Sequence, residues 1–166
     1  MEAKETILIF GVSSFVGSSL AEFFKHDFKV IGTYHSEPVW IDGVTTIPVD
    51  VLKREQVQLA IFTFRPKYTI YAVGLSSLSE CDTNSQLAEA LNTGGLFNVA
   101  ENSQRYKSRL VYISSAFIFA GLDKTYLEKD TPDPNTVYGN QVASAEFYIQ
   151  KNCLNYLIFR CSKFYG

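Results

Sequence analysis

The sequence carries small residues at a fixed spacing near its start, in the run Gly11-Val-Ser-Ser14-Phe-Val-Gly17. A G-x-x-S-x-x-G turn between a strand and a helix suits the binding of a pyrophosphate. Gly11 permits the tight turn, Ser14 is small enough for backbone to approach phosphate, and Gly17 lets the helix pack closely on the strand. The following Phe15 and Val16 would present unpaired N–H groups at the positive end of the helix. Small residues also occur in ordinary strand–helix turns, but the position directly after the first apolar strand favours phosphate binding.

The rest of the chain repeats this alternation of strand and helix. Several of the strand-length runs are apolar almost throughout, as strands covered on both faces are. These runs are Thr6–Phe10, Phe28–Thr33, Thr45–Val49, Tyr68–Val73, Arg109–Ser114 and Asn155–Arg160. Stretches of helical periodicity lie between them, at Val16–Lys25, Arg54–Phe64, Ser85–Tyr106 and Tyr138–Asn152. This order predicts a doubly wound Rossmann α/β fold, with a largely parallel sheet and helices on both faces.

Composition excludes several classes of protein. The 166 residues are 46% apolar with a formal net charge of −2, which suits one domain with a single core and gives no basic surface for nucleic acid or an anionic membrane. No apolar stretch approaches the roughly 18 residues of a membrane span. Three cysteines without a CxxC pair fit a reducing cytosol, and two histidines without a Cys/His cluster argue against a metal site. We therefore expect a cytoplasmic protein.

Beyond the first turn, the sequence resembles the extended short-chain dehydrogenases/reductases over its whole length. The first turn is similar to that family's GxxGxxG, with Ser14 at the middle glycine, and further landmarks follow in the family's order. Among the subfamilies, the run YISSAFIFAGLDKTYLEKDTPDPNTVYG looks most similar to sugar-nucleotide reductases of the dTDP-4-dehydrorhamnose reductase type. The further landmarks are Asp50-Val51, Ile70–Gly74, Cys81-Asp82, Asn92, Ser115, Tyr138 and Arg160–Gly166.

The resemblance implies a cofactor site and a catalytic pair. Asp50 and Val51 would contact the adenine, and the strand end Ala72, Val73 and Gly74 would line the cofactor. Ser115 would donate a hydrogen bond to the developing oxyanion, and Tyr138, also beside the cofactor, would supply the proton. The implied activity is NAD(P)-dependent hydride transfer to the carbonyl of a nucleotide sugar.

One departure from the family affects this chemistry directly. The family pattern is Y-x-x-x-K, in which the lysine binds the nicotinamide ribose and lowers the pKa of the tyrosine. Here the residue four positions after Tyr138 is Val142. Gln141 comes one residue early and points about 100° around the helix, so it is a poor substitute. Lys163, just beyond the last strand, is the one replacement that the sequence offers.

A second departure is length, since the family's C-terminal substrate domain has no counterpart before Gly166. We expect residues 1–166 to form a single NAD(P)-binding domain, either as a fragment or as a cofactor domain without its own substrate half. Both departures predict dinucleotide binding with weak or no turnover by this chain alone.

The residues that end the second strand bear on the choice between NADP and NAD. The run Tyr34-His35-Ser36 has no carboxylate to repel a 2′-phosphate, and His35 and Ser36 could donate to one. No arginine is present to bind that phosphate, so the cofactor stays NADP or NAD, with NADP favoured.

Several functions stay open at this point. A nucleotide-sugar epimerase or dehydratase would share the same cofactor half. A non-catalytic dinucleotide-binding or regulatory protein is the rival that Val142 favours. A homodimer is implied by resemblance, because family members often pair through the helix that carries the tyrosine.

Overall fold

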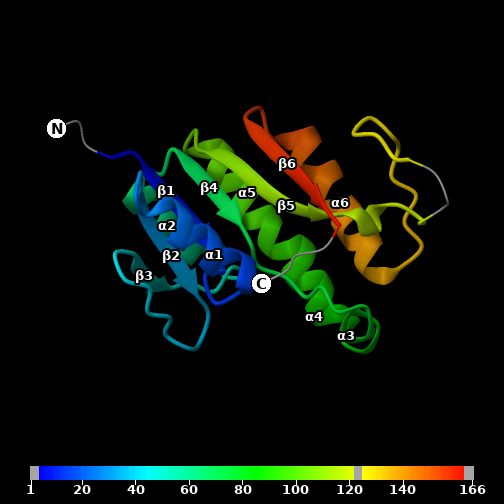
Figure 1. Cartoon of the computed structure of the whole chain (residues 1–166), viewed down its shortest axis with the longest axis horizontal. Helices are drawn as coiled ribbons and strands as arrows, with labels where there is room; N and C mark the ends of the chain where they lie inside the picture. Colours follow the sequence, from blue (N-terminus) through cyan, green and yellow to red (C-terminus); the bar gives the residue numbers. More distant parts are fainter. Residues whose placement is uncertain (1–3, 122–124, 163–166) are drawn as a thin grey trace.

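The computed structural model describes residues 4–121 and 125–162. At its centre lies a six-stranded sheet in which every neighbouring pair of strands is parallel, in the order β3-β2-β1-β4-β5-β6 (Figure 1). The strands are β1 Thr6–Phe10, β2 Lys29–Tyr34, β3 Thr45–Pro48, β4 Tyr68–Tyr71, β5 Arg109–Ser115 and β6 Tyr156–Cys161. The predicted doubly wound α/β fold is confirmed.

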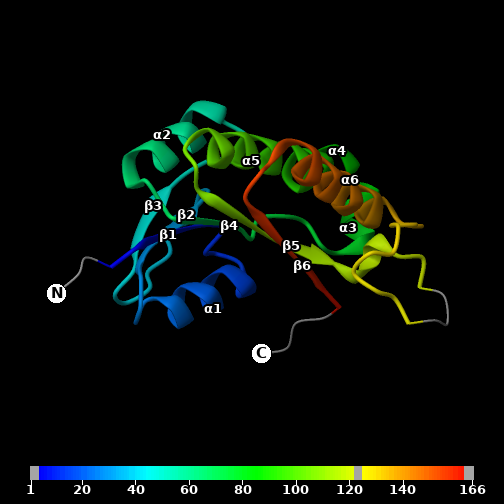
Figure 2. The same cartoon turned by 90° about the horizontal axis from the view of Figure 1, so that it is seen from above.

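Helices cover both faces of the sheet, but unequally (Figure 2). One face is covered by α1, Phe15–Phe24. The other is covered by α2 Arg54–Phe64, α5 Leu96–Arg105 and α6 Val137–Asn152. Two separate apolar clusters fill the spaces between the sheet and these two layers. Burial on both faces is the reason that the central strands are apolar almost throughout.

The strand order reverses between β1 and β4. From β1 the chain adds β2 and β3 on one side, and then crosses to build β4, β5 and β6 on the other. The connections at this point leave in opposite directions, so a crevice forms at the carboxyl ends of β1 and β4. The first turn, which follows β1, therefore lies at the edge of that crevice.

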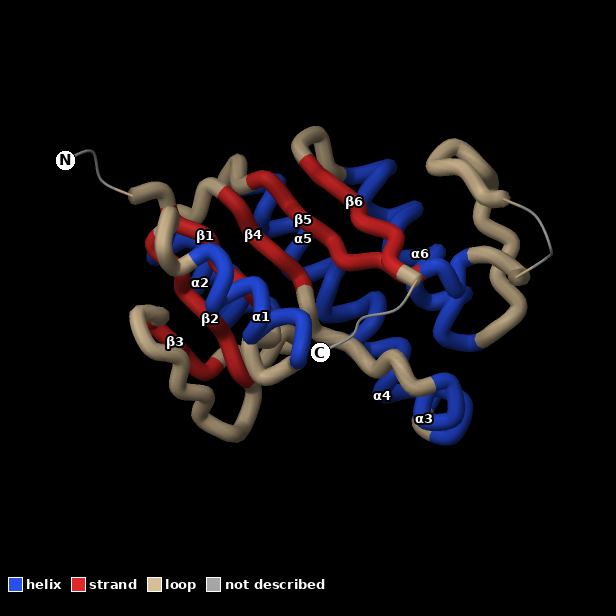
Figure 3. The backbone as a smooth tube through the Cα atoms, in the orientation of Figure 1, coloured by secondary structure: helices blue, strands red, loops and turns tan. Residues whose placement is uncertain are grey.

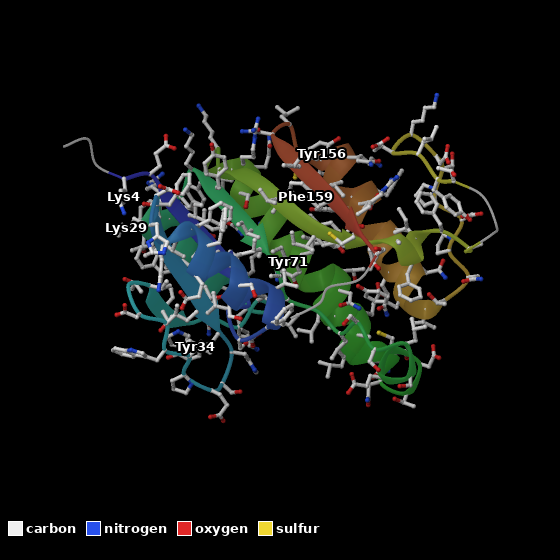
Figure 4. All side chains as sticks on the ribbon, viewed as in Figure 1. Lys4, Lys29, Tyr34, Tyr71, Tyr156 and Phe159 are labelled. Carbon is white, nitrogen blue, oxygen red and sulfur yellow. The ribbon has the colours of Figure 1, made fainter. Side chains whose placement is uncertain are left out.

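The register of the sheet aligns three large side chains in one row. Phe10 pairs with Tyr71, and Tyr71 pairs with Tyr112. All three are at most 4% exposed, and the two tyrosine ring centroids lie 6.4 Å apart. The row belongs to the apolar cluster between the sheet and the layer of α2, α5 and α6, and Figure 4 shows Tyr71 near the middle of the sheet.

The helix expected over Ser85–Tyr106 is divided into three parts, α4 Ser85–Glu89, a π-helical segment Ala90–Gly95 and α5. The Tyr71 hydroxyl donates to the Leu91 carbonyl at 2.6 Å. Gly95 passes so close that a Cβ there would lie 2.6 Å from the same hydroxyl. The wider π turn allows the helix to accommodate the side chain of Tyr71. The hydrophobic periodicity of the sequence did not reveal this interruption of the helix.

The remaining elements are short. A helix α3, Leu78–Thr83, and a 3₁₀ turn, Ala116–Ile118, were not predicted, because neither is long enough to show a hydrophobic period. Between β2 and β3 the chain forms a loop over residues 35–44 (Figure 3). Within the described ranges, no helix is both long and apolar enough to cross a bilayer.

Candidate functional site

A pocket of about 450 Å³ opens at the crevice where the strand order reverses. Its walls come from the first turn, from the segments after β4 and β5, and from the start of α6. The predicted site residues that line it are Ser14, Phe15, Val16, Ala72, Val73, Gly74, Ser115 and Tyr138. Residues far apart in the sequence are thus brought together at one place.

The first turn depends on two glycines. Gly11 has a φ of 93°, a left-handed conformation that side chains rarely adopt, and a Cβ there would lie 2.8 Å from the Ala72 carbonyl oxygen. At Gly17 a Cβ would lie 2.1 Å from the Gly11 carbonyl oxygen. The helix therefore packs against the turn at a distance that only glycine permits.

Ser14 occupies the middle position without obstructing the turn. Its hydroxyl points inward, accepting from the Gly17 N–H at 3.0 Å, and lies 2.7 Å from the Gly11 carbonyl oxygen and 3.1 Å from that of Ala72. The residue caps helix α1 and ties the turn to the end of β4.

The amides of the first helical turn remain for a ligand. Phe15 and Val16 begin α1, where backbone N–H groups have no helical carbonyl to bond to, and both residues line the pocket. Together with the positive end of the helix dipole, these N–H groups form an anion-binding arrangement of the kind that phosphates use.

Ser115 and Tyr138 reach the pocket from different elements. Ser115 ends β5, and Tyr138 lies in the first turn of α6. Burial raises the pKa of Tyr138 above its ordinary value, and a hydrogen bond with the Ser115 side chain opposes this rise. Gly139 allows the helix to approach, since a Cβ there would lie 2.2 Å from the Phe117 carbonyl oxygen. The pair can hold a carbonyl oxygen and supply it with a proton.

Val142 also lines this pocket, one helical turn after Tyr138. It is 2% exposed, so a hydrocarbon side chain occupies the position at which a lysine would act. None of the described residues that line the pocket is Lys, Arg, His, Asp or Glu. The described lining therefore mixes apolar side chains with hydroxyl and amide groups and carries no formal charge.

Sequence reasoning missed a buried ion pair beside the pocket. Glu146, two turns after Tyr138 on α6, is 1% exposed and accepts from Arg160 of β6, whose Nη2 lies 2.8 Å from its Oε2. The hydroxyl of Ser114, a pocket residue, also bonds to Glu146. The Arg160 Nη1 further donates to the Glu128 carbonyl at 2.9 Å. No local pattern in the sequence links Glu146 with Arg160, since the two residues lie 14 positions apart on different elements.

The residues predicted for the adenosine half lie outside this pocket. Tyr34 ends β2 (Figure 4), and His35 and Ser36 are exposed immediately after it. The His35 Nε2 lies 3.9 Å from the Asp50 Oδ2, so an exposed side chain after β2 meets a partly buried one after β3.

Asp50 and Val51 differ in what their side chains contact. The Asp50 Oδ1 accepts from the Leu52 N–H at 2.9 Å, which fixes the turn after β3. Val51 is 5% exposed and packs in the core, where a Cβ added to Gly95 would meet it at 2.8 Å. Only its backbone can therefore face a ligand, and its carbonyl already accepts from Asn98.

The other landmarks have separate environments. Asn92 lines the pocket, whereas Cys81 is buried next to it and bonds to the Leu75 carbonyl at 3.3 Å. Asp82 is exposed. Lys163 lies outside the described residues.

The chain is a Rossmann-type α/β protein, because its parallel sheet has helices on both faces and a glycine turn where the strand order reverses. A family profile described as "RmlD substrate binding domain" matches residues 5–166. The chain belongs to this family, and the predicted resemblance to dTDP-4-dehydrorhamnose reductase-like proteins is confirmed.

Individual relatives agree with this assignment. Methionine adenosyltransferase 2 subunit beta of Rattus norvegicus is 28% identical over 118 residues, 71% of this chain and 35% of the relative. The dTDP-4-dehydrorhamnose reductase of Aggregatibacter actinomycetemcomitans is 25% identical over 163 residues, 96% of this chain and 52% of the relative. A crystal structure of dTDP-4-dehydrorhamnose reductase from Bacillus anthracis in complex with NADP superimposes with a TM-score of 0.86 at 25% identity, covering 100% of this chain and 56% of that one. The chain thus spans between a third and about half of the length of these relatives.

Proposed function

We propose that residues 1–166 act as one NAD(P)-binding domain and that the pocket at the switch point holds the nicotinamide half of the cofactor. The observation that carries this proposal is the meeting, in one pocket, of the N–H groups of Phe15 and Val16 with the side chains of Ser115 and Tyr138. The turn would bind the pyrophosphate, and the wall of Ala72, Val73 and Gly74 would lie along the cofactor.

NADP(H) is the cofactor that we favour over NAD(H). No carboxylate stands among Tyr34, His35 and Ser36 to repel a 2′-phosphate, and the two exposed side chains can donate to one. The Asp50 Oδ2 lies 3.9 Å from the His35 Nε2, and the Asp50 Oδ1 is already bonded to the Leu52 N–H. The Bacillus anthracis relative was crystallised with NADP.

For the reaction, we propose reduction of a carbonyl on a nucleotide sugar. The bound cofactor would supply the hydride. Ser115 would hold the carbonyl oxygen, and Tyr138, kept protonated by its raised pKa, would donate the proton to the forming alkoxide. An epimerase or dehydratase reaction would use the same cofactor half, so the substrate decides between them.

A non-catalytic, regulatory role is the second candidate, and Val142 favours it. No Lys or Arg is among the described residues that line the pocket with Tyr138, so on this part of the chain neither the phenolate nor the nicotinamide ribose is held as in a Y-x-x-x-K site. Five relatives are named as a subunit, the beta subunit of methionine adenosyltransferase 2. A chain of this kind would use the dinucleotide as a ligand instead of a reactant.

We also propose that the chain pairs with a second copy through the outer face of α6. Phe147 is 66% exposed there, and beside it the rings of Phe97 and Tyr148 stack at 4.0 Å. These apolar groups line a shallow surface groove with no helix over it in the described chain.

The cytoplasm is the compartment we propose, since Cys81, Cys153 and Cys161 are all free thiols.

The test is calorimetric titration of the chain with NADPH and NADH, followed by NADPH oxidation in the presence of a 4-keto nucleotide sugar. Binding with turnover supports the reductase, and binding without turnover supports the regulatory role. Gly17→Asp is the control, because a carboxylate at that point adds bulk against the Gly11 carbonyl and repels pyrophosphate. Absence of affinity for either dinucleotide would exclude both.

A further inference from the structure

The amide side chain of Asn92 makes three close hydrogen bonds, and its Nδ2 also lies 4.0 Å from the Cys81 Sγ. Its Oδ1 accepts from the Leu75 N–H at 2.9 Å, and its Nδ2 donates to the Leu75 carbonyl at 2.9 Å. The second Nδ2 hydrogen goes to the Gln141 Oε1 at 2.8 Å. Only one orientation of the amide satisfies this set, because the first partner is a donor and the other two are acceptors.

This set of bonds joins three parts of the site. Leu75 follows the pocket wall of Ala72, Val73 and Gly74, and Asn92 lies in the π-helical segment. Gln141 lies on α6, three residues after Tyr138. Asn92 and Gln141 are each 4% exposed, so their bonds are made away from water and are costly to leave unmade.

The wall and the amide also fit closely in space. A Cβ at Gly74 would lie 2.6 Å from the Asn92 Oδ1, so the amide determines how near the backbone of the wall can come. A small rotation of Asn92 would therefore move the peptide at Gly74 and Leu75, and with it the pocket wall that follows β4.

We infer that Gln141 is a positioning residue of the dinucleotide pocket. It locks the orientation of the Asn92 amide, and through that amide it fixes the wall after β4 relative to Tyr138. The side chain is not a substitute for the missing lysine, because it does not line the pocket and its Oε1 is bonded to Asn92. This role rests on the proposed binding of a dinucleotide.

A variant that keeps the length of the side chain but loses the amide tests the inference. In Gln141→Met, one Asn92 N–H loses its acceptor, and the Leu75 amide should exchange its hydrogen at least tenfold faster by NMR. The Ile149 amide, further along α6, should be unchanged. Gln141→Glu retains an acceptor oxygen at the same place and should restore slow exchange at Leu75. This measurement needs no ligand, so it remains decisive even if the proposed cofactor site is wrong.

Ligand binding supplies the second measurement. In Gln141→Met, NADPH affinity should fall about tenfold, while the affinity for ADP-ribose, which lacks the nicotinamide, should change less than twofold. Gln150→Met makes the same chemical change at an exposed position of α6 and should leave both affinities unchanged. Equal losses for both ligands, or unchanged exchange at Leu75, would overturn the inference. If the unmodified chain binds neither ligand while Leu75 responds as expected, the proposed function fails and the positioning of the wall stands.

Discussion

Tyr138 and Val142 lie one turn apart on α6, and both side chains line the same pocket. Burial raises the pKa of Tyr138, and no charged side chain among the described pocket residues opposes that effect. Tyr138 therefore stays protonated at neutral pH and can donate a proton, but within residues 4–121 and 125–162 no cation lines the pocket to stabilise its phenolate.

Val142→Lys should lower the pKa of Tyr138. An ammonium group within about 4–6 Å of the phenol typically lowers its pKa by 1–3 units, so Tyr138 should titrate at lower pH. The difference in ultraviolet absorbance between Val142→Lys and Val142→Lys/Tyr138→Phe, followed against pH, isolates this tyrosine from the others. NADPH should also bind more tightly, through the ribose.

The matched control is Val137→Lys, which adds the same charge on α6 at a position that is 38% exposed and does not line the pocket. It should leave the titration of Tyr138 unchanged.

We expect the unmodified chain to turn over little or no 4-keto nucleotide sugar. Turnover at a rate typical of the family would contradict this expectation and direct attention to Lys163.

Gly17→Ala should damage the first turn. The added Cβ would lie 2.1 Å from the Gly11 carbonyl oxygen, so α1 must move away from the turn. Overpacking of this kind costs about 1–3 kcal/mol, and NADPH affinity should fall with it. Urea denaturation and calorimetry measure the two effects. Gly94→Ala is the control, since a Cβ there meets nothing within 4 Å, and it should be neutral or stabilising.

The sequence predicted those features that depend on local pattern. Strand–helix alternation is local, and so are the small residues of the first turn and the spacing that brings Val142 to the side of Tyr138. The bond between Asn92 and Gln141 joins residues 49 positions apart, and hydrophobic periodicity carries no information about it. The pairing of Glu146 with Arg160 was missed for the same reason, because two elements must first be packed before their charges can meet.

Ser14 illustrates a different limit. Its small size was readable from the sequence, but the inward rotation of its hydroxyl onto Gly17 and the carbonyl of Ala72 was not. That rotation depends on how close β4 lies to the first turn. The location of Val51 in the core is likewise a consequence of packing against Gly95.

Tyr34→Asp should reverse the preference for cofactor. A carboxylate at the end of β2 would repel a 2′-phosphate and accept hydrogen bonds from ribose hydroxyls, so NADH should bind more tightly than NADPH. Tyr34→Asn is the control, since it can bond to the ribose without the charge. Titration of each variant with both dinucleotides measures the ratio of affinities. A clear preference of the unmodified chain for NADH would contradict our reading of Tyr34, His35 and Ser36.

Stability should fall steeply in alkali. Burial raises the pKa of Tyr71, Tyr112 and Tyr138 in the folded chain, whereas in the unfolded chain they titrate near pH 10. Their contribution to stability is therefore complete below about pH 10 and is lost as the pH rises toward the folded-state values. Each group adds a slope of about 1.4 kcal/mol per pH unit above pH 10. Urea denaturation at several pH values should show a shallower slope in Tyr112→Phe, but not in Tyr156→Phe, which alters an exposed residue of β6.

Replacing only Arg160 of the Arg160–Glu146 ion pair should lower the free energy of unfolding more than replacing both residues. Arg160→Leu leaves a carboxylate that is 1% exposed, with the Ser114 hydroxyl as its one remaining partner among the described residues, and such a loss costs about 3–5 kcal/mol. It also removes the donor to the Glu128 carbonyl, so the segment before α6 loses an attachment.

The double variant Arg160→Leu/Glu146→Leu removes both charges and should regain most of that loss, because the cost comes mainly from a buried charge without its counterion. Free energies of unfolding in urea for the two single variants and the double variant give the coupling energy directly. Arg109→Leu is the control, since Arg109 lies on the neighbouring strand β5, is exposed and bonds only to the exposed Asn155 side chain among the described contacts. Losses that simply add in the double variant would show that the two side chains stabilise the fold independently, and that the pair is not what joins β6 to α6.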